Sequence, residues 1–285
     1  MRGKNLTVDI GGISIAVTCY SNKELSFPDN YEQFITDKNP EVFLNVWDCD
    51  APHFSLGKKV FDSENVSTYR SGEELIIFFR ILKRVDTLPR SVTKINPRLK
   101  SIDLYVKSDE HEQCFYPLPF LSRFIVANIL SWGLGVIMHA SGINDNGQGI
   151  IFAGYSGAGK TTLAALWKSA NRTILDDDRV IVRKKEECFW VCGTPWFENI
   201  QFSSPEMCPL ERIFFVEHAK RNTVVQKKGV DALRDILSHT FCPTWYVPGM
   251  QFTMDFLSEL ARRVPCYHLG FVPDESIVDF VGKIC

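Results

Sequence analysis

The 285-residue sequence predicts an α/β fold in which a β-rich N-terminal region precedes a core built around a phosphate-binding loop. Three observations predict it. A glycine-rich loop, Gly154 to Thr161, lies between an apolar run and a segment of helical character. A short apolar segment, residues 173–175, follows that helix and ends in three aspartates. The first 106 residues instead hold short apolar runs separated by prolines. We expect domains of residues 1–116 and 117–285.

The N-terminal region is expected to form antiparallel strands rather than βαβ units. The predicted strands cover residues 8–10, 13–17, 42–46, 75–79 and 102–106, and prolines 28, 40, 52, 89 and 97 separate them. This region could bind substrate, dimerise or brace the core, and the sequence leaves those roles open.

The second region should begin with a helix at residues 120–131, which the Pro117-Leu118-Pro119 segment opens. A strand over residues 136–141 follows, then the loop strand 149–153, a helix over 160–169 and a strand over 173–175. Further strands are expected at 189–191 and 212–216, and helices at 230–239, 254–263 and 275–284.

The spacing of the glycine-rich loop suits a phosphate chain. Its glycines let successive backbone N–H groups turn inward, and the start of the following helix favours negative charge. Lys160 would reach the β- and γ-phosphates and the Thr161 hydroxyl would bind Mg²⁺. The residues expected to contact the nucleotide are Gly154, Tyr155, Ser156, Gly157, Ala158, Gly159, Lys160, Thr161 and Thr162.

The aspartates at 176–178 end the strand that returns beside this loop. One strand-end carboxylate can hold Mg²⁺ while its neighbour accepts a proton from an attacking hydroxyl. The alternative is a solvated acidic turn paired with Arg179. His139 lies at the end of the predicted strand 136–141, where a histidine is otherwise a packed or capping residue.

The order and spacing of these residues resemble a known family. His139 is followed after twenty-one residues by Lys160, and after seventeen more by Asp177-Asp178-Arg179-Val180. This arrangement is similar to the catalytic core of bacterial HPr kinase/phosphorylase and its relatives, whose fold resembles the nucleotide core of phosphoenolpyruvate carboxykinase. The resemblance implies that Lys160 and Thr161 serve ATP and Mg²⁺, Asp177 is the general base, Asp178 assists the metal and His139 orients or tunes Asp177.

The resemblance is strong over residues 134–182 and loose beyond them. The second signature of HPr kinases, Glu-Ile-Arg-Gly-Leu-Gly, does not occur. The corresponding segment, residues 192–199, resembles HPr-kinase-related proteins encoded beside peptide-modification genes. The expected activity is therefore transfer of the γ-phosphoryl group of ATP to a Ser or Thr hydroxyl of a protein or peptide, with HPr itself not expected as the acceptor. Self-association is also implied by the resemblance.

The composition limits the binding partners and the cellular compartment that we expect. The net charge is −2, and no basic stripe indicates a nucleic acid or a membrane surface as a partner. Nine cysteines show no metal-ligand spacing, and Cys188 and Cys192 are expected as buried thiols on one strand. With no signal-peptide pattern at the start, a cytoplasmic protein is expected.

Two other functions remain open. Because the loop does not specify the acceptor, the protein could be a small-molecule hydroxyl kinase. It could also be a nucleotide-dependent switch or binding protein. Three further residues are candidates for an accessory role in transfer: Glu198 as a second acid, and Arg212 or Arg221 as a neutralising cation.

Overall fold

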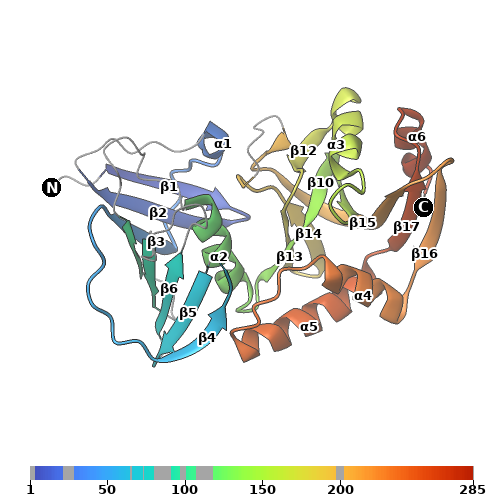
Figure 1. Ribbon diagram of the computed structural model, residues 1–285. Coiled ribbons are helices and arrows are strands. Elements are labelled where there is room, and N and C mark those ends of the chain that lie inside the picture. Colours follow the sequence, from blue (N-terminus) through green and yellow to red (C-terminus); the bar gives the residue numbers. More distant parts are fainter. Residues whose placement is uncertain are drawn as a thin grey trace. The chain divides into compact units, whose positions relative to one another are not determined.

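The structure is a computed structural model that describes residues 4–21, 29–64, 66–72, 74–79, 91–96, 101–106, 118–196 and 202–284. Contacts divide the chain into two units, Met1–Phe124 and Ile125–Cys285 (Figure 1). The predicted boundary at residue 117 lies outside the described residues. Within the described residues, no helix is long and apolar enough to span a membrane.

The N-terminal unit contains an eight-stranded sheet with the order β1-β2-β3-β8-β7-β6-β5-β4. The strands are β1 (Lys4–Ile10), β2 (Ile13–Tyr20), β3 (Val42–Trp47), β4 (Lys58–Asp62), β5 (Val66–Ser71), β6 (Glu74–Phe79), β7 (Ser91–Ile95) and β8 (Ser101–Val106), and a short helix α1 (Asp29–Glu32) precedes β3. All five predicted strands are confirmed, while β4, β5 and β7 were not predicted.

The prediction of a wholly antiparallel sheet is wrong in one place. β3 runs parallel to both of its neighbours, β2 and β8. The segment between Tyr20 and Val42 contains α1 and is long enough for the crossover that a parallel pair requires. The sheet is therefore mixed, with antiparallel pairs on either side of β3.

The C-terminal unit contains a nine-stranded sheet. The strands are β9 (Gly135–Met138), β10 (Ala140–Asp145), β11 (Gln148–Ala153), β12 (Thr173–Asp176), β13 (Val180–Lys185), β14 (Cys188–Cys192), β15 (Met207–His218), β16 (Thr223–Lys227) and β17 (Cys266–Phe271). Their order is β12-β10-β11-β15-β14-β13-β9, and β17 pairs with both β15 and β16. Cys188 and Cys192 share β14 as predicted, but Cys188 is exposed and Cys192 alone is buried.

The predicted single strand over 136–141 is wrong, because the chain breaks at His139. β9 pairs with β13, whereas β10 pairs with β11 and β12. The backbone N–H of His139 donates instead to the carbonyl of His239 at 2.7 Å, and the N–H of Ala140 donates to Asp178 at 3.0 Å. His139 thus lies between two strands with different partners.

Helices cover both faces of this sheet (Figure 1). Side chains alternate along β11, so that Ile150 and Phe152 pack with α3 (Lys160–Ser169) and α6 (Ser276–Gly282). Ile151 and Ala153 pack on the opposite side with α4 (Gly229–Ser238) and α5 (Val247–Arg263). The helix α2 (Leu118–Leu130) spans the division between the units. These helices confirm the predicted ones, although α5 begins seven residues earlier, with a proline in its first turn.

Strand directions bring several chain segments to one edge of this sheet. β11, β15 and β17 are parallel, so their C-terminal ends lie at the same edge. β10 is antiparallel to both β11 and β12, so the C-terminal end of β12 and the N-terminal end of β10 lie there too. His139, the glycine-rich loop and the three aspartates therefore meet at this edge, which we call the loop edge.

Candidate functional site

The glycine-rich loop connects β11 directly to α3, as the sequence predicted. Gly157 and Gly159 have φ of 82° and 98°, in the left-handed region that favours glycine. A Cβ on Gly159 would lie 2.4 Å from the Phe271 ring and 3.0 Å from His218, whereas a Cβ on Gly157 would meet nothing within 4 Å. Gly159 thus serves both the backbone conformation and the packing of the ends of β15 and β17 against the loop.

Lys160 begins α3 and folds back into the loop. Its ammonium donates to the carbonyls of Gly154 at 2.9 Å and Tyr155 at 3.3 Å. Burial lowers the pKa of Lys160, and Arg179 lowers it further, while the Asp177 charge opposes that shift. The ammonium therefore lies inside the loop, where a phosphate bound to the loop backbone would also lie.

The backbone donors of the loop suit an anion. Within residues 156–162, the N–H of Ala158 donates to Tyr155 at 3.1 Å. In the part of the chain that the structure describes, no acceptor is found for the N–H groups of residues 156, 157 and 159–162. Ser156, Thr161 and Thr162 are exposed, and a row of unpaired N–H groups at a helix start is a ready anion site.

The three aspartates occupy three different environments. Asp176 is completely buried and ends β12. It accepts hydrogen bonds from the N–H groups of Asp178 at 2.7 Å and Arg179 at 2.8 Å, and from the Thr194 hydroxyl at 3.0 Å. Burial raises the pKa of Asp176 well above its ordinary value despite these donors. Asp176 therefore shapes the turn that presents the next two residues.

Asp177 is buried and its carboxylate is bare. The side chain is 2% exposed, and neither oxygen has a hydrogen bond that meets the usual geometry among the described residues. Burial raises the pKa of Asp177, while the nearby Thr161 hydroxyl and the Lys160 ammonium favour its charged form. The loop edge thus holds an uncommitted carboxylate next to the first two residues of α3.

Asp178 is held by two partners. His139 Nε2 lies 3.2 Å from one carboxylate oxygen, and the Arg179 guanidinium binds the other. The pKa of His139 is lowered by burial and by the charges of Lys160 and Arg179. The negative charge of Asp178 would raise the pKa of His139, but the Arg179 guanidinium partly neutralises that charge. We therefore assign a neutral imidazole to His139, with Nε2–H donating a hydrogen bond to Asp178. The expected partner of His139 was Asp177, and the structure places His139 against Asp178 instead.

A second histidine at the loop edge was not predicted. His239 follows α4, is 8% exposed and packs its ring against Tyr155 and Phe215, with centroid separations of 5.4 and 5.9 Å. Burial, with His139 and Lys160 close by, lowers the pKa of His239. No local pattern indicates this residue, because its approach depends on the pairing of the end of α4 with the chain around His139.

The expected cofactors can be tested against these residues. The Asp178 carboxylate and the exposed Thr161 hydroxyl are hard oxygen donors of the kind that Mg²⁺ prefers, and the open N–H groups suit phosphates. Among the described residues, no cluster of three or more His, Cys, Asp or Glu side chains forms a metal site made of protein alone. Mg²⁺ is commonly bound by one or two carboxylates together with substrate phosphates, so these residues fit ATP with Mg²⁺.

Of the accessory candidates, Arg212 is committed elsewhere. Its guanidinium donates to the Val281 carbonyl at 3.2 Å and to Ile284 at 2.5 Å, and so anchors the C-terminal segment. Arg221 is exposed in the turn between β15 and β16, at the loop edge. Glu198 lies outside the described residues.

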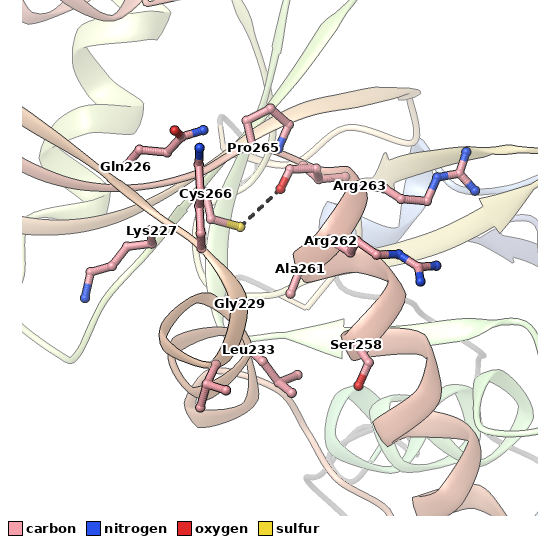
Figure 2. Close-up of a pocket in the computed structure, with 13 residues that line it drawn as sticks. Gln226, Lys227, Gly229, Leu233, Ser258, Ala261, Arg262, Arg263, Pro265 and Cys266 are labelled. Carbon is pink, nitrogen blue, oxygen red and sulfur yellow. Dashed lines mark hydrogen bonds between the residues drawn. The ribbon is translucent and has the colours of Figure 1, made fainter.

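A cavity of about 510 Å³ lies at the opposite edge of the sheet, at the start of β17 (Figure 2). Its walls include Leu233, Ala261 and Cys266. The guanidinium groups of Arg262 and Arg263 extend to the side of α5 away from Leu233 (Figure 2), and Lys227 pairs with Asp235 at 2.9 Å. The described residues that line this cavity include lysines and arginines but no carboxylate or histidine that could act as a base.

In comparisons with known proteins, only solved structures matched this chain. No protein-family model and no curated protein matches the sequence. Among solved structures, the HPr(Ser) kinase/phosphatase from Coxiella burnetii matches with a TM-score of 0.30 and 9% sequence identity, over 52% of this chain and 93% of that one.

Proposed function

We propose that the protein is a kinase that transfers the γ-phosphoryl group of ATP, with Mg²⁺, to a Ser or Thr hydroxyl of a protein or peptide. One observation carries the proposal. The buried, bare carboxylate of Asp177 lies beside Lys160 and Thr161, where a glycine-rich loop enters a helix. A carboxylate without hydrogen bonds is costly to bury, and a site that binds phosphate and moves a proton gives it a use.

The loop would bind the nucleotide through its phosphates. The N–H groups of residues 156–162 would donate to phosphate oxygens, and Lys160 would exchange the Gly154 and Tyr155 carbonyls for the β- and γ-phosphates. Thr161 and a carboxylate of the aspartate turn would hold Mg²⁺, which when bound would neutralise charge on the β- and γ-phosphates.

Asp177 would act as the general base. Its raised pKa brings it closer to the range in which a carboxylate accepts protons efficiently. It would take the proton of the acceptor hydroxyl while the hydroxyl oxygen bonds to the γ-phosphorus and the bridging oxygen of the nucleotide leaves.

Asp178 would help to bind the metal, and His139 would position the Asp178 side chain. His139 and Arg179 each contact one oxygen of Asp178, and a carboxylate has about four lone-pair sites, so Asp178 keeps sites that could bind Mg²⁺. We therefore assign His139 to the orientation of Asp178 rather than Asp177. The motif resemblance supports a protein or peptide as the acceptor.

The experiment follows label from γ-labelled ATP with Mg²⁺. Purified protein would be incubated with a lysate of the native organism and, separately, with its small-molecule fraction. A labelled protein or peptide band supports the proposal. Label confined to small molecules favours the metabolite kinase, and tight ATP binding without transfer to either fraction favours the switch. An Asp177→Asn protein is the matched control, because it removes the base and preserves the shape of the side chain.

A further inference from the structure

The imidazole of His239 has one satisfied nitrogen and one bare nitrogen. Nδ1 lies 2.8 Å from the Asp235 carbonyl and 3.0 Å from the Ser238 hydroxyl. A carbonyl can only accept, so Nδ1 carries the proton, and Nε2 of the neutral ring is an acceptor. Nε2 is fully buried and has no partner among the described residues. A buried acceptor left without a donor calls for a physical explanation.

The surroundings of His239 place this acceptor beside the reacting end of a nucleotide. Its charge environment includes Lys160 and His139, and its ring packs on Tyr155. Lys160 is the residue that reaches the β- and γ-phosphates in this kind of loop. Asp177 is near Lys160 and Thr161, at the start of α3, whereas His239 contacts Tyr155, at the other end of the loop.

Tyr155 contacts both His239, through its ring, and Lys160, through its backbone carbonyl. Tyr155 is exposed, with a relative exposure of 74%, and its ring contacts the imidazole at a centroid separation of 5.4 Å and an interplanar angle of 46°. Its backbone carbonyl accepts a hydrogen bond from the Lys160 ammonium at 3.3 Å. When Lys160 turns to a phosphate, this carbonyl loses one of its two donors and keeps the Ala158 N–H at 3.1 Å, so one constraint on Tyr155 is removed.

We propose that Nε2 of His239 is a hydrogen-bond acceptor in the phosphoacceptor subsite, and that the Tyr155 ring covers it until a nucleotide engages Lys160. The inference rests on the proposed function and adds to it a binding residue and an order of binding, nucleotide first. Because the hydroxyl proton of the acceptor goes to Asp177, the donor to His239 is an N–H group next to that hydroxyl, such as the backbone amide of a peptide.

The exposure of His239 can be measured without an acceptor. Diethyl pyrocarbonate modifies accessible unprotonated imidazole nitrogens, and peptide mass spectrometry would give the rate at His239, with exposed His53 of the N-terminal unit as the reference. We expect slow modification of the protein alone and a rate at least about tenfold higher with saturating Mg²⁺ and a non-hydrolysable ATP analogue. Tyr155→Ala should give the fast rate without nucleotide.

Binding of the same analogue, measured first by equilibrium dialysis, separates the two proposals. If the analogue does not bind, the proposed function fails and this inference fails with it. If it binds while His239 remains protected, the inference alone is overturned. Rapid modification of His239 in the free wild-type protein would also overturn it.

Two substitutions test the role of Nε2 once an acceptor is known. His239→Asn keeps a donor near the Nδ1 position and removes the acceptor at Nε2, whereas His239→Gln returns an amide oxygen near the Nε2 position. We expect His239→Asn to raise KM for the acceptor about tenfold or more, with the affinity for ATP unchanged and partial recovery in His239→Gln. Equal effects of both variants on ATP affinity would contradict an acceptor-side role.

Discussion

The two units differ in the burial and in the hydrogen-bond partners of their ionisable side chains. In the N-terminal unit, charged groups pair near the surface, as Lys94 does with Glu74 at 2.8 Å, and the partly buried Asp103 accepts from Asn45 and Trp47. Among its described residues, some buried hydroxyl groups on β5 and β7 have no hydrogen-bond partner. In the C-terminal unit, the loop edge buries a bare carboxylate and a bare imidazole nitrogen.

This difference is one reason why we propose that the chemistry takes place at the loop edge. A neutral hydroxyl without a partner costs little compared with a buried carboxylate. An arrangement that a stable core would avoid is retained at the loop edge, next to a lysine and a row of open N–H groups. Perturbed titratable groups of this kind cluster at functional sites.

The largest expected effect comes from Lys160→Met. Removing the ammonium should reduce phosphoryl transfer by about a thousandfold, because it removes the side-chain donor expected at the transferred phosphate. Its matched control in the N-terminal unit is Lys94→Met, which breaks a half-exposed pair and should alter stability by less than about 0.5 kcal/mol. Transfer rates and urea unfolding of both variants check the comparison, and a similar loss of transfer in both would break it.

Asp176→Ala should destabilise the C-terminal unit by about 3 kcal/mol, because it leaves the backbone N–H groups of Asp178 and Arg179 without their acceptor in a buried turn. The Thr194 hydroxyl would keep the Arg179 carbonyl at 2.7 Å as its acceptor. Asp103→Ala in the N-terminal unit should cost about 1 kcal/mol, since Asp103 is partly exposed and water can replace it. Hydrogen exchange resolved by peptide would show which unit opens. A smaller effect for Asp176 than for Asp103 would contradict the structural role given to the aspartate turn.

Two glycines of the loop should differ in their tolerance of alanine. Gly157→Ala requires a left-handed conformation only and should cost about 1 kcal/mol. Gly159→Ala adds a clash with the Phe271 ring and should cost about 2 kcal/mol or more. Thermal unfolding measures both, and equal costs would show that the contact with Phe271 does not constrain the loop.

The smallest expected effect is on the pH dependence of stability. The folded-state pKa of His239 is lowered, so the unfolded chain binds the proton more readily below the ordinary value of 6.5. Stability from this group is present above pH 6.5 and is lost as the pH falls toward the lowered pKa. The wild type should therefore lose up to about 1.4 kcal/mol relative to His239→Asn between pH 7.5 and 5.5. Parallel urea curves at both pH values check this, and no difference would place His239 in a more solvated setting.

The sequence could predict what depends on local spacing. The loop, its flanking strand and the helix over 160–169 follow from residues close together in the chain, and all are confirmed. The break at His139 was missed because an apolar run does not reveal that its two halves pair with different strands. His239 was missed because α4 brings it to the loop edge from about eighty residues beyond the loop, through packing that no local pattern encodes.

The parallel pairing of β3 could not be predicted for a similar reason. Alternating apolar residues mark a strand and its buried face, and they do not give the direction of its neighbours. The roles of the three aspartates also depend on burial. Asp176, Asp177 and Asp178 are equivalent in sequence, and only the turn after β12 separates a structural acceptor, a bare carboxylate and an ion-pair partner.

The role of Asp177 can be tested by comparing Asp177→Asn with the wild type. Two quantities would be measured on the same preparation: the affinity for ATP with Mg²⁺, and the rate of transfer from γ-labelled ATP. We predict an affinity within about threefold of wild type and transfer reduced at least about a hundredfold, the usual scale for loss of a general base. Transfer close to the wild-type rate in this variant would contradict the account, because the bare carboxylate at the loop edge would then have no part in the chemistry.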